Sequence, residues 1–98
     1  GMPEPPDAIF AFNDTMALGA LTAVNEFKLR VPDDVAVVGF DDIPMAGWPV
    51  FQLTTVRYDI KEIARIIAHS IVGRTDHQAA ENGNIMVTPE LVVRSTAL

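Results

Sequence analysis

Two short apolar runs, each followed by a polar side chain, set the pattern in the first half of the chain. Residues 8–12 are followed by Asn13, and residues 35–40 are followed by Asp41. Apolar runs of this length between turn residues are typical of strands buried on both faces of a parallel sheet. The carboxyl ends of parallel strands lie along one edge, where such sheets bind ligands, so Asn13 and Asp41 are predicted to face one crevice.

Two segments carry the period of a helix. In residues 15–29, one face carries apolar side chains at helical spacing, namely Ala17, Leu21, Val24 and Phe27. This predicts a helix between the two strands and hence a right-handed strand–helix–strand unit. Residues 59–72 form the clearer helix. Asp59 and Glu62 resemble a capping box at its start, and Gly73 is placed to end it. Its predicted apolar stripe consists of Ile60, Ile63, Ala64, Ile67, Ala68, Ile71 and Val72.

The rest of the chain predicts further strands joined by loops. Short strands are expected at residues 53–56, 84–88 and 91–94, and the prolines and glycine within residues 44–49 predict a loop or a single helical turn. Residues 74–83 are polar and turn-rich, which predicts a mobile loop. The alternation of strands and helices indicates an α/β fold built on a partial doubly wound parallel sheet.

Composition and charge narrow the classes of function. The formal net charge is -6, and the seven basic residues are scattered along the sequence. Nucleic-acid binding depends on clustered lysine and arginine, so this chain by itself is not expected to hold DNA. The absence of cysteine excludes a disulfide framework and a cysteine-based metal site.

No segment predicts a membrane span or a secretion signal. No stretch approaches the ~20 apolar residues that a membrane span requires. The first residues lack the basic and apolar regions of a signal peptide. A cytoplasmic location with no membrane partner is therefore expected.

Four segments stand in one order along nearly the whole chain. They are FNDTMALGAL, VPDDVAVVGFDDIP, LTTVRYD and ELVVRSTA. Together they make the chain resemble the effector-binding core of the lactose-repressor and galactose-repressor (LacI/GalR) family of bacterial transcription regulators. The resemblance implies the C-terminal part of that core, an incomplete lobe of the periplasmic-binding-protein-like type I fold.

The resemblance also implies how the chain is divided. Residues 1–98 would form a C-terminal fragment of the effector-binding domain. Residues 6–56 and 91–98 would belong to the C-terminal lobe, and residues 59–88 to the other lobe. In this family two lobes close on a small molecule, and the helix-turn-helix reader of DNA lies outside the present chain. The implied function is effector sensing and dimerisation.

Asn13 and Asp41 are the two predicted ligand contacts. Position alone favours Asn13 as a helix cap, whereas the resemblance implies that it contacts the effector. The resemblance assigns the same role to Asp41, whose carboxylate can accept hydrogen bonds from two neighbouring hydroxyls. A sugar is the first expectation for the ligand, with a purine or another metabolite as alternatives.

The polar residues beside these two are expected to be structural. Asp14 is expected to support the fold, and Asp42 to cap the turn at Ile43. The resemblance places Arg57 and Arg94 near the lobe crossover and the last strand, where salt bridges are expected.

Catalysis and metal binding find little support. Asp14, Asp41 and Asp42 could in principle form an acid/base pair or a metal site, but adjacent carboxylates on one loop usually diverge, and no histidine lies beside them. No arrangement for nucleophilic catalysis is present. We therefore expect no enzyme activity, no catalytic residue, no metal and no cofactor.

Residues 47–51 suggest a contact surface. This loop carries Trp48, Val50 and Phe51 with no period that would bury them. The resemblance implies that it meets a partner subunit together with the outer face of the first helix around Leu18, giving a homodimer or higher oligomer. The alternative is that the loop folds onto its own core. Gln52 departs from the family, which usually has proline before Leu-Thr-Thr.

Two other classes remain as alternatives. A periplasmic sugar-binding transport protein shares the fold and both strand-to-helix junctions, but it should carry a signal peptide and seldom shows the LTTVR and ELVVRS segments. An enzyme of the doubly wound class would need a glycine-rich phosphate loop or a catalytic constellation, and neither is visible.

Overall fold

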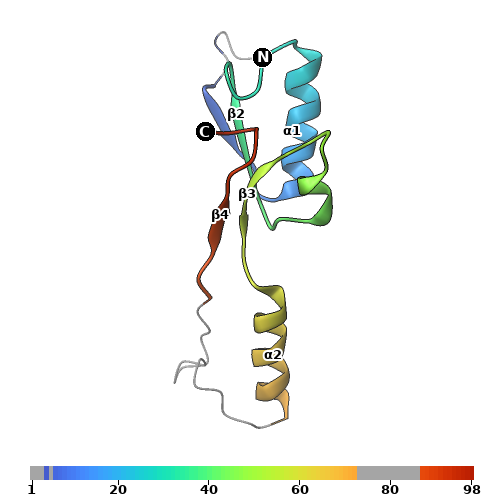
Figure 1. Ribbon diagram of the computed structural model, residues 1–98, viewed down its shortest axis with the longest axis vertical. Coiled ribbons are helices and arrows are strands. Elements are labelled where there is room, and N and C mark those ends of the chain that lie inside the picture. The colour runs from blue at the N-terminus through green and yellow to red at the C-terminus, as the bar shows by residue number, and fades with distance from the viewer. Residues whose placement is uncertain (1–3, 5, 73–86) are drawn as a thin grey trace. The chain divides into compact units, whose positions relative to one another are not determined.

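The computed structural model describes residue 4, residues 6–72 and residues 87–98 (Figure 1). In order along the chain, the elements are β1 (Ala8–Phe10), α1 (Asp14–Glu26), β2 (Ala36–Phe40), the one-turn 3-10 helix η1 (Pro44–Gly47), β3 (Thr54–Arg57), α2 (Ile60–Ile71) and β4 (Glu90–Val92). The strand predicted at 84–88 and the loop predicted at 74–83 fall largely or wholly outside these residues.

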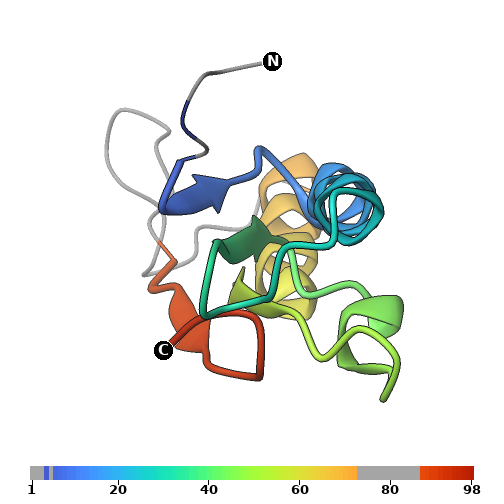
Figure 2. The same ribbon diagram turned by 90° about the horizontal axis from the view of Figure 1, so that it is seen from above.

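The described strands form one sheet in the order β1-β2-β3-β4 (Figure 2). The first three strands are parallel, and β4 runs antiparallel to β3. Helix α1 connects β1 to β2 and packs against β2. The predicted α/β fold class is confirmed. Because β1 and β2 are adjacent and parallel, their carboxyl ends lie side by side, and the residues that follow them are close in space.

The chain divides into two compact units. One contains residues 1–57 and 90–98, and the other contains residues 58–89. The bounds resemble the predicted division between lobes, which stays a prediction as an assignment to lobes of a larger protein. Neither helix in the described ranges has the length and apolar character of a membrane span.

The core of the first unit lies between α1, β2 and the segment that leads from η1 into β3. Its buried members are Ala11, Ala17, Leu18, Val24, Val35, Val37, Ala46 and Leu53. Leu18 had been expected on the outer face of the helix, yet only 9% of it is exposed. That placement was wrong, because Leu18 follows Ala17 on the side of α1 that packs against the sheet.

The predicted limits of the first helix need a second correction. Helix α1 ends at Glu26, so Phe27 is its C-cap and is 78% exposed, although its spacing had placed it in the buried stripe. After Arg30 the chain turns, and the Arg30 backbone N and guanidinium both donate to Asp34. The Arg30 side-chain hydrogen bond is the main reason that the pKa of the Asp34 carboxyl lies below its usual value.

Helix α2 begins as predicted and buries a different residue than predicted. Asp59 is the N-cap, and its Oδ1 accepts from the backbone N of Glu62 at 3.0 Å. Ile66 is fully buried, although the predicted stripe had passed it over, whereas Ile60 and Ile71 are exposed. Spacing alone marked an apolar face, and it did not identify which part of that face is covered.

Candidate functional site

Asn13 stands at the junction between β1 and α1. Its backbone is extended, with φ of -154°, and its Oδ1 accepts from the backbone N of Met16 at 2.9 Å. The capping prediction is therefore confirmed. Capping occupies the side-chain oxygen, and the amide nitrogen of an asparagine carries two further N–H donors. Asn13 can thus cap the helix and offer donors to a ligand.

Asp41 follows β2 directly and turns the chain sharply. Its φ is 128° and that of Asp42 is 59°, both in the positive range that favours glycine. The backbone N of Asp41 donates to the Val56 carbonyl of β3 at 2.9 Å. This bond ties the start of the turn to the neighbouring strand and leaves the Asp41 side chain half-buried.

Asn13 and Asp41 line one open pocket of about 650 Å³ at the carboxyl ends of β1 and β2. Its other lining residues are Phe10, Phe12 and Phe40. The structure therefore brings the two predicted ligand contacts together. Sequence reasoning missed the three phenylalanines. The available signal was that Phe12 and Phe40 immediately precede the two polar residues.

Asp14 follows Asn13 as the first residue of α1 and is fully buried. One carboxylate oxygen, Oδ1, accepts from the Thr55 hydroxyl, and Oδ2 accepts from the Ile43 backbone N at 2.8 Å. The expectation that Asp14 is structural is confirmed. Thr55 had not been singled out, because a threonine in a strand gives no local sign of a partner 41 residues away.

Asp42 is held by arginines. Arg94 Nη2 donates to Asp42 Oδ1 at 2.8 Å, and Arg57 Nη1 lies 3.6 Å from Asp42 Oδ2. Arg57 also pairs with Glu90 at 3.1 Å. The predicted salt bridges of the two arginines are confirmed. The predicted capping role of Asp42 was wrong, because η1 has no side-chain cap and the carboxylate is turned toward Arg94.

The loop before β3 is divided between core and surface. Phe51 packs against the core, and its ring stacks with that of Trp48 at a centroid distance of 6.4 Å. Trp48 is 49% exposed and Val50 is 77% exposed. The alternative of a loop folded onto its own core therefore applies to Phe51, while Trp48 and Val50 leave an apolar surface.

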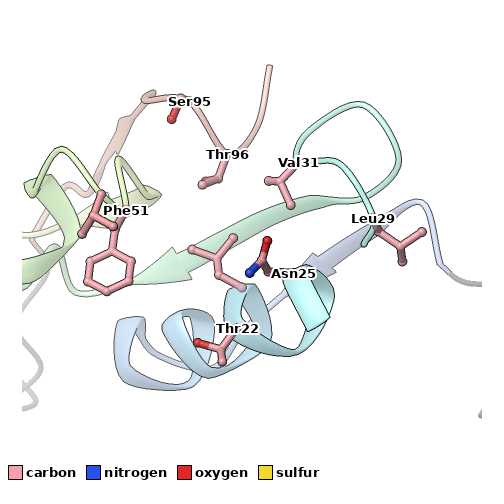
Figure 3. A pocket seen from close by; sticks show the side chains of 9 residues that line it. Thr22, Asn25, Leu29, Val31, Phe51, Ser95 and Thr96 are labelled. Carbon is pink, nitrogen blue, oxygen red and sulfur yellow. The ribbon is translucent and has the colours of Figure 1, made fainter. Parts of the chain in front are cut away.

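A second concavity, of about 470 Å³, lies between α1 and the chain segments that carry Val50 and Thr96. Figure 3 shows that Thr22 and Asn25 of α1 form one wall of this concavity, and that Phe51 and Thr96 line other parts of it. It contains none of the predicted ligand contacts.

The backbone at Gln52 shows why this position does not hold the proline that the family usually has. Its φ is 44°, a value that the proline ring does not allow. Its backbone N donates to the Trp48 carbonyl, and its side-chain Nε2 donates to the Gly47 carbonyl at 2.8 Å. A proline here would lose the first bond, so this chain enters β3 by a turn that proline cannot form.

Within the described ranges, no group of three or more histidine and acidic side chains is placed to hold a metal ion. The carboxylates of Asp14 and Asp42 are engaged with different partners. The pocket offers the polar side chains of Asn13 and Asp41 and the aromatic side chains of Phe10, Phe12 and Phe40.

The sequence matches the family described as periplasmic binding protein-like domain over residues 1–97. The chain belongs to this family. It is 35% identical over 95 residues to the probable HTH-type transcriptional repressor ExuR of Bacillus subtilis, covering 97% of this chain and 28% of that protein. It is 35% identical over 96 residues to the HTH-type transcriptional repressor PurR of Haemophilus influenzae, covering 95% of this chain and 29% of that protein.

Solved structures agree with this assignment. A LacI transcriptional regulator from a Rhodococcus species is similar, with a TM-score of 0.80, 34% identity and coverage of 98% of this chain and 35% of that one. A LacI-family regulator from Arthrobacter in complex with lactose has a TM-score of 0.79 and 34% identity, and the match covers 94% of this chain and 35% of that one. The resemblance to the effector-binding core of LacI-type regulators is confirmed, and the chain spans less than a third of the curated relatives' length.

Proposed function

We propose that the chain is the effector-sensing and dimerising part of a cytoplasmic LacI-type transcription regulator, and that it binds a small metabolite, a sugar first of all. The observation that carries this proposal is that Asn13 and Asp41 line one pocket. Family membership alone leaves a periplasmic transport protein open. The regulator is favoured because the relatives are HTH-type repressors.

The residues of the pocket suit a polyhydroxylated ring. An ionised Asp41 carboxylate accepts only, so it can bridge two neighbouring hydroxyl groups, and the Asn13 amide can donate to a ring or hydroxyl oxygen. Phe12 is 84% exposed, and its ring can pack on an apolar C–H face. The Arthrobacter neighbour is described in complex with lactose, and a Lactobacillus casei neighbour with bound glucose.

The regulatory step follows from binding thermodynamics. A ligand shifts the equilibrium between two conformations only by its different affinity for them. We propose that closure around the ligand at Asp41 changes the spacing of DNA-reading domains that lie outside this chain. DNA contact is assigned to those domains because the chain has a net charge of -6 and scattered basic residues.

Replacing Asp41 with alanine in the full-length protein tests the proposal. Loss of a charged acceptor is expected to weaken effector binding by about 1.5–3 kcal/mol, or roughly ten- to a hundredfold. The ligand is first chosen by thermal-shift screening that starts with lactose and glucose, and the affinity is then measured by calorimetry. Asp33→Ala removes the same charge from an exposed turn and should leave the affinity unchanged. An unchanged affinity in Asp41→Ala would contradict the assignment.

The proposed dimer contact uses the loop that ends in Phe51. Trp48 and Val50 expose apolar surface, and Val50 also lines the concavity beside α1, so a projection and a hollow lie next to each other. Such a pair suits a self-complementary interface, in which the projection of each copy can enter the hollow of the other. Leu18, buried in the core, and Phe51, half-buried beneath the loop, would support this surface from within.

A lysine at Val50 is expected to weaken the dimer, because a charged group would be buried without a partner at two symmetric places. In the full-length protein, the dissociation constant of the dimer should rise more than about tenfold in Val50→Lys. Sedimentation velocity over a concentration series measures it. Lys28→Glu, which also changes an exposed side chain, serves as the control. A monomeric unmodified protein would refute the interface.

A further inference from the structure

The backbone that carries Asp41 is held in an unfavourable conformation. Asp41 and Asp42 have φ values of 128° and 59°, and side chains other than glycine avoid this range. Such conformations persist only where surrounding contacts hold them, and they gather at binding sites. The position of the Asp41 carboxylate therefore depends on whatever holds residues 41–43.

Contacts on two sides hold this loop within the described residues. The Asp41 backbone N donates to Val56, and Arg94 donates to the Asp42 carboxylate at 2.8 Å. On the opposite side, the Ile43 backbone N donates to Asp14 Oδ2, also at 2.8 Å. Asp14 thus anchors the far end of the turn to the first residue of α1, beside the other predicted ligand contact, Asn13.

The Asp14 carboxylate is itself fixed in orientation. It is fully buried, and the Thr55 hydroxyl donates to its Oδ1, which leaves Oδ2 directed at Ile43. Gly39 of β2 gives it room, since a side chain there would collide with Oδ1. Neither Asp14 nor Thr55 lines the pocket.

We propose that Asp14, oriented by Thr55, is a positioning residue for the ligand site. It fixes the strained turn and thereby aims Asp41 without touching the ligand. The inference rests on the proposed function for what Asp41 binds, whereas the effect on the turn is independent of any ligand. Asp14 joins the start of α1, the turn after β2 and strand β3, so both ligand contacts share one buried anchor.

Hydrogen–deuterium exchange of the full-length protein, read by mass spectrometry, tests the proposal without ligand. In Asp14→Ala, peptides spanning residues 39–46 should exchange about tenfold faster relative to peptides from residues 20–26 of α1, because the turn loses one hydrogen bond. Asp14→Asn should restore most of the protection. Its oxygen can accept from Ile43, and its amide can donate to the Thr55 oxygen.

The matched control is Val35→Ala. It opens a cavity in the same core, but at the opposite end of β2 from Asp41, so it destabilises the fold without releasing the turn. If residues 39–46 exchange no faster in Asp14→Ala than in Val35→Ala, the proposal is overturned. Should Asp14→Ala fail to fold, Thr55→Val decides the question, since it keeps the carboxylate and removes only its orientation.

Calorimetric titration with lactose separates this inference from the proposed function. Asp14→Ala is expected to lose about tenfold in affinity, and Val35→Ala is expected to retain it. Failure of the unmodified protein to bind any sugar would count against the proposed ligand class, with the exchange result still deciding the role of Asp14. Normal binding by Asp14→Ala would overturn the positioning role.

Discussion

Replacing Gly39 with alanine is expected to lower the free energy of unfolding by about 1–3 kcal/mol, because the core beside it has no room for a methyl group. An added Cβ would lie 3.0 Å from Leu53 Cδ2 and 3.2 Å from Ala17 Cβ, and it would collide with Asp14 Oδ1. The methyl group would therefore push against α1, the Leu53 side chain and the buried carboxylate. Urea unfolding followed by circular dichroism measures the loss.

Gly19 supplies the matched control. It lies on the exposed side of α1, and an added Cβ there meets nothing within 4 Å. Gly19→Ala should raise the free energy of unfolding by about 0.5–1 kcal/mol, since alanine stabilises a helix interior relative to glycine. The same chemical change is thus expected to act with opposite signs at the two sites. Equal effects would show that close packing at Gly39 has been overestimated.

Arg94→Met should destabilise the fold by about 2–3 kcal/mol, because it leaves a largely buried carboxylate without its main partner. The Arg94 side chain is 18% exposed and that of Asp42 is 11% exposed. Arg94 also donates to the Leu53 carbonyl at 2.8 Å, so two acceptors lose a charged donor. This loss is smaller than the loss for a fully buried ion pair, because water still reaches both side chains.

Arg57→Met removes the weaker of the two arginine partners of the Asp42 carboxylate. Arg57 is 52% exposed, lies 3.6 Å from Asp42, and pairs with a Glu90 side chain that is 69% exposed. Exposed pairs of this kind contribute about 0–1 kcal/mol, and salt screens them. The free energy of unfolding of both variants is measured at low and at high salt. Arg57→Met should lower it by less than Arg94→Met, and its effect should shrink as salt is added. Losses of equal size would contradict the assignment of Arg94 as the main partner.

The local features of this chain could be predicted closely. Asp59 caps α2 as the spacing to Glu62 indicated, and Asn13 caps α1. Strand β2 falls within the apolar run that marked it. These features depend on side chains a few residues apart, so the order of residues along the chain contains the necessary information.

The candidate site was predictable to the extent that it follows from strand ends. Asn13 and Asp41 each follow a parallel strand, and neighbouring parallel strands present their carboxyl ends at one edge. The aromatic lining was missed, because an apolar residue at a strand end can face either the core or the solvent. Phe10 and Phe12 are largely exposed in this structure, and that cannot be read from a run of apolar residues.

By itself, the sequence indicated the two helices with their N-caps, the four described strands, the two polar strand ends and the family. Only the tertiary structure decided which distant side chains meet. Asp14 binds Thr55 across 41 residues and Ile43 across 29, and Arg94 reaches Asp42 across 52. Periodicity and capping are short-range effects, whereas these contacts exist only after the sheet order has placed β2, β3 and the start of α1 side by side. The same reason explains Leu18, whose burial depends on which face of α1 the sheet covers.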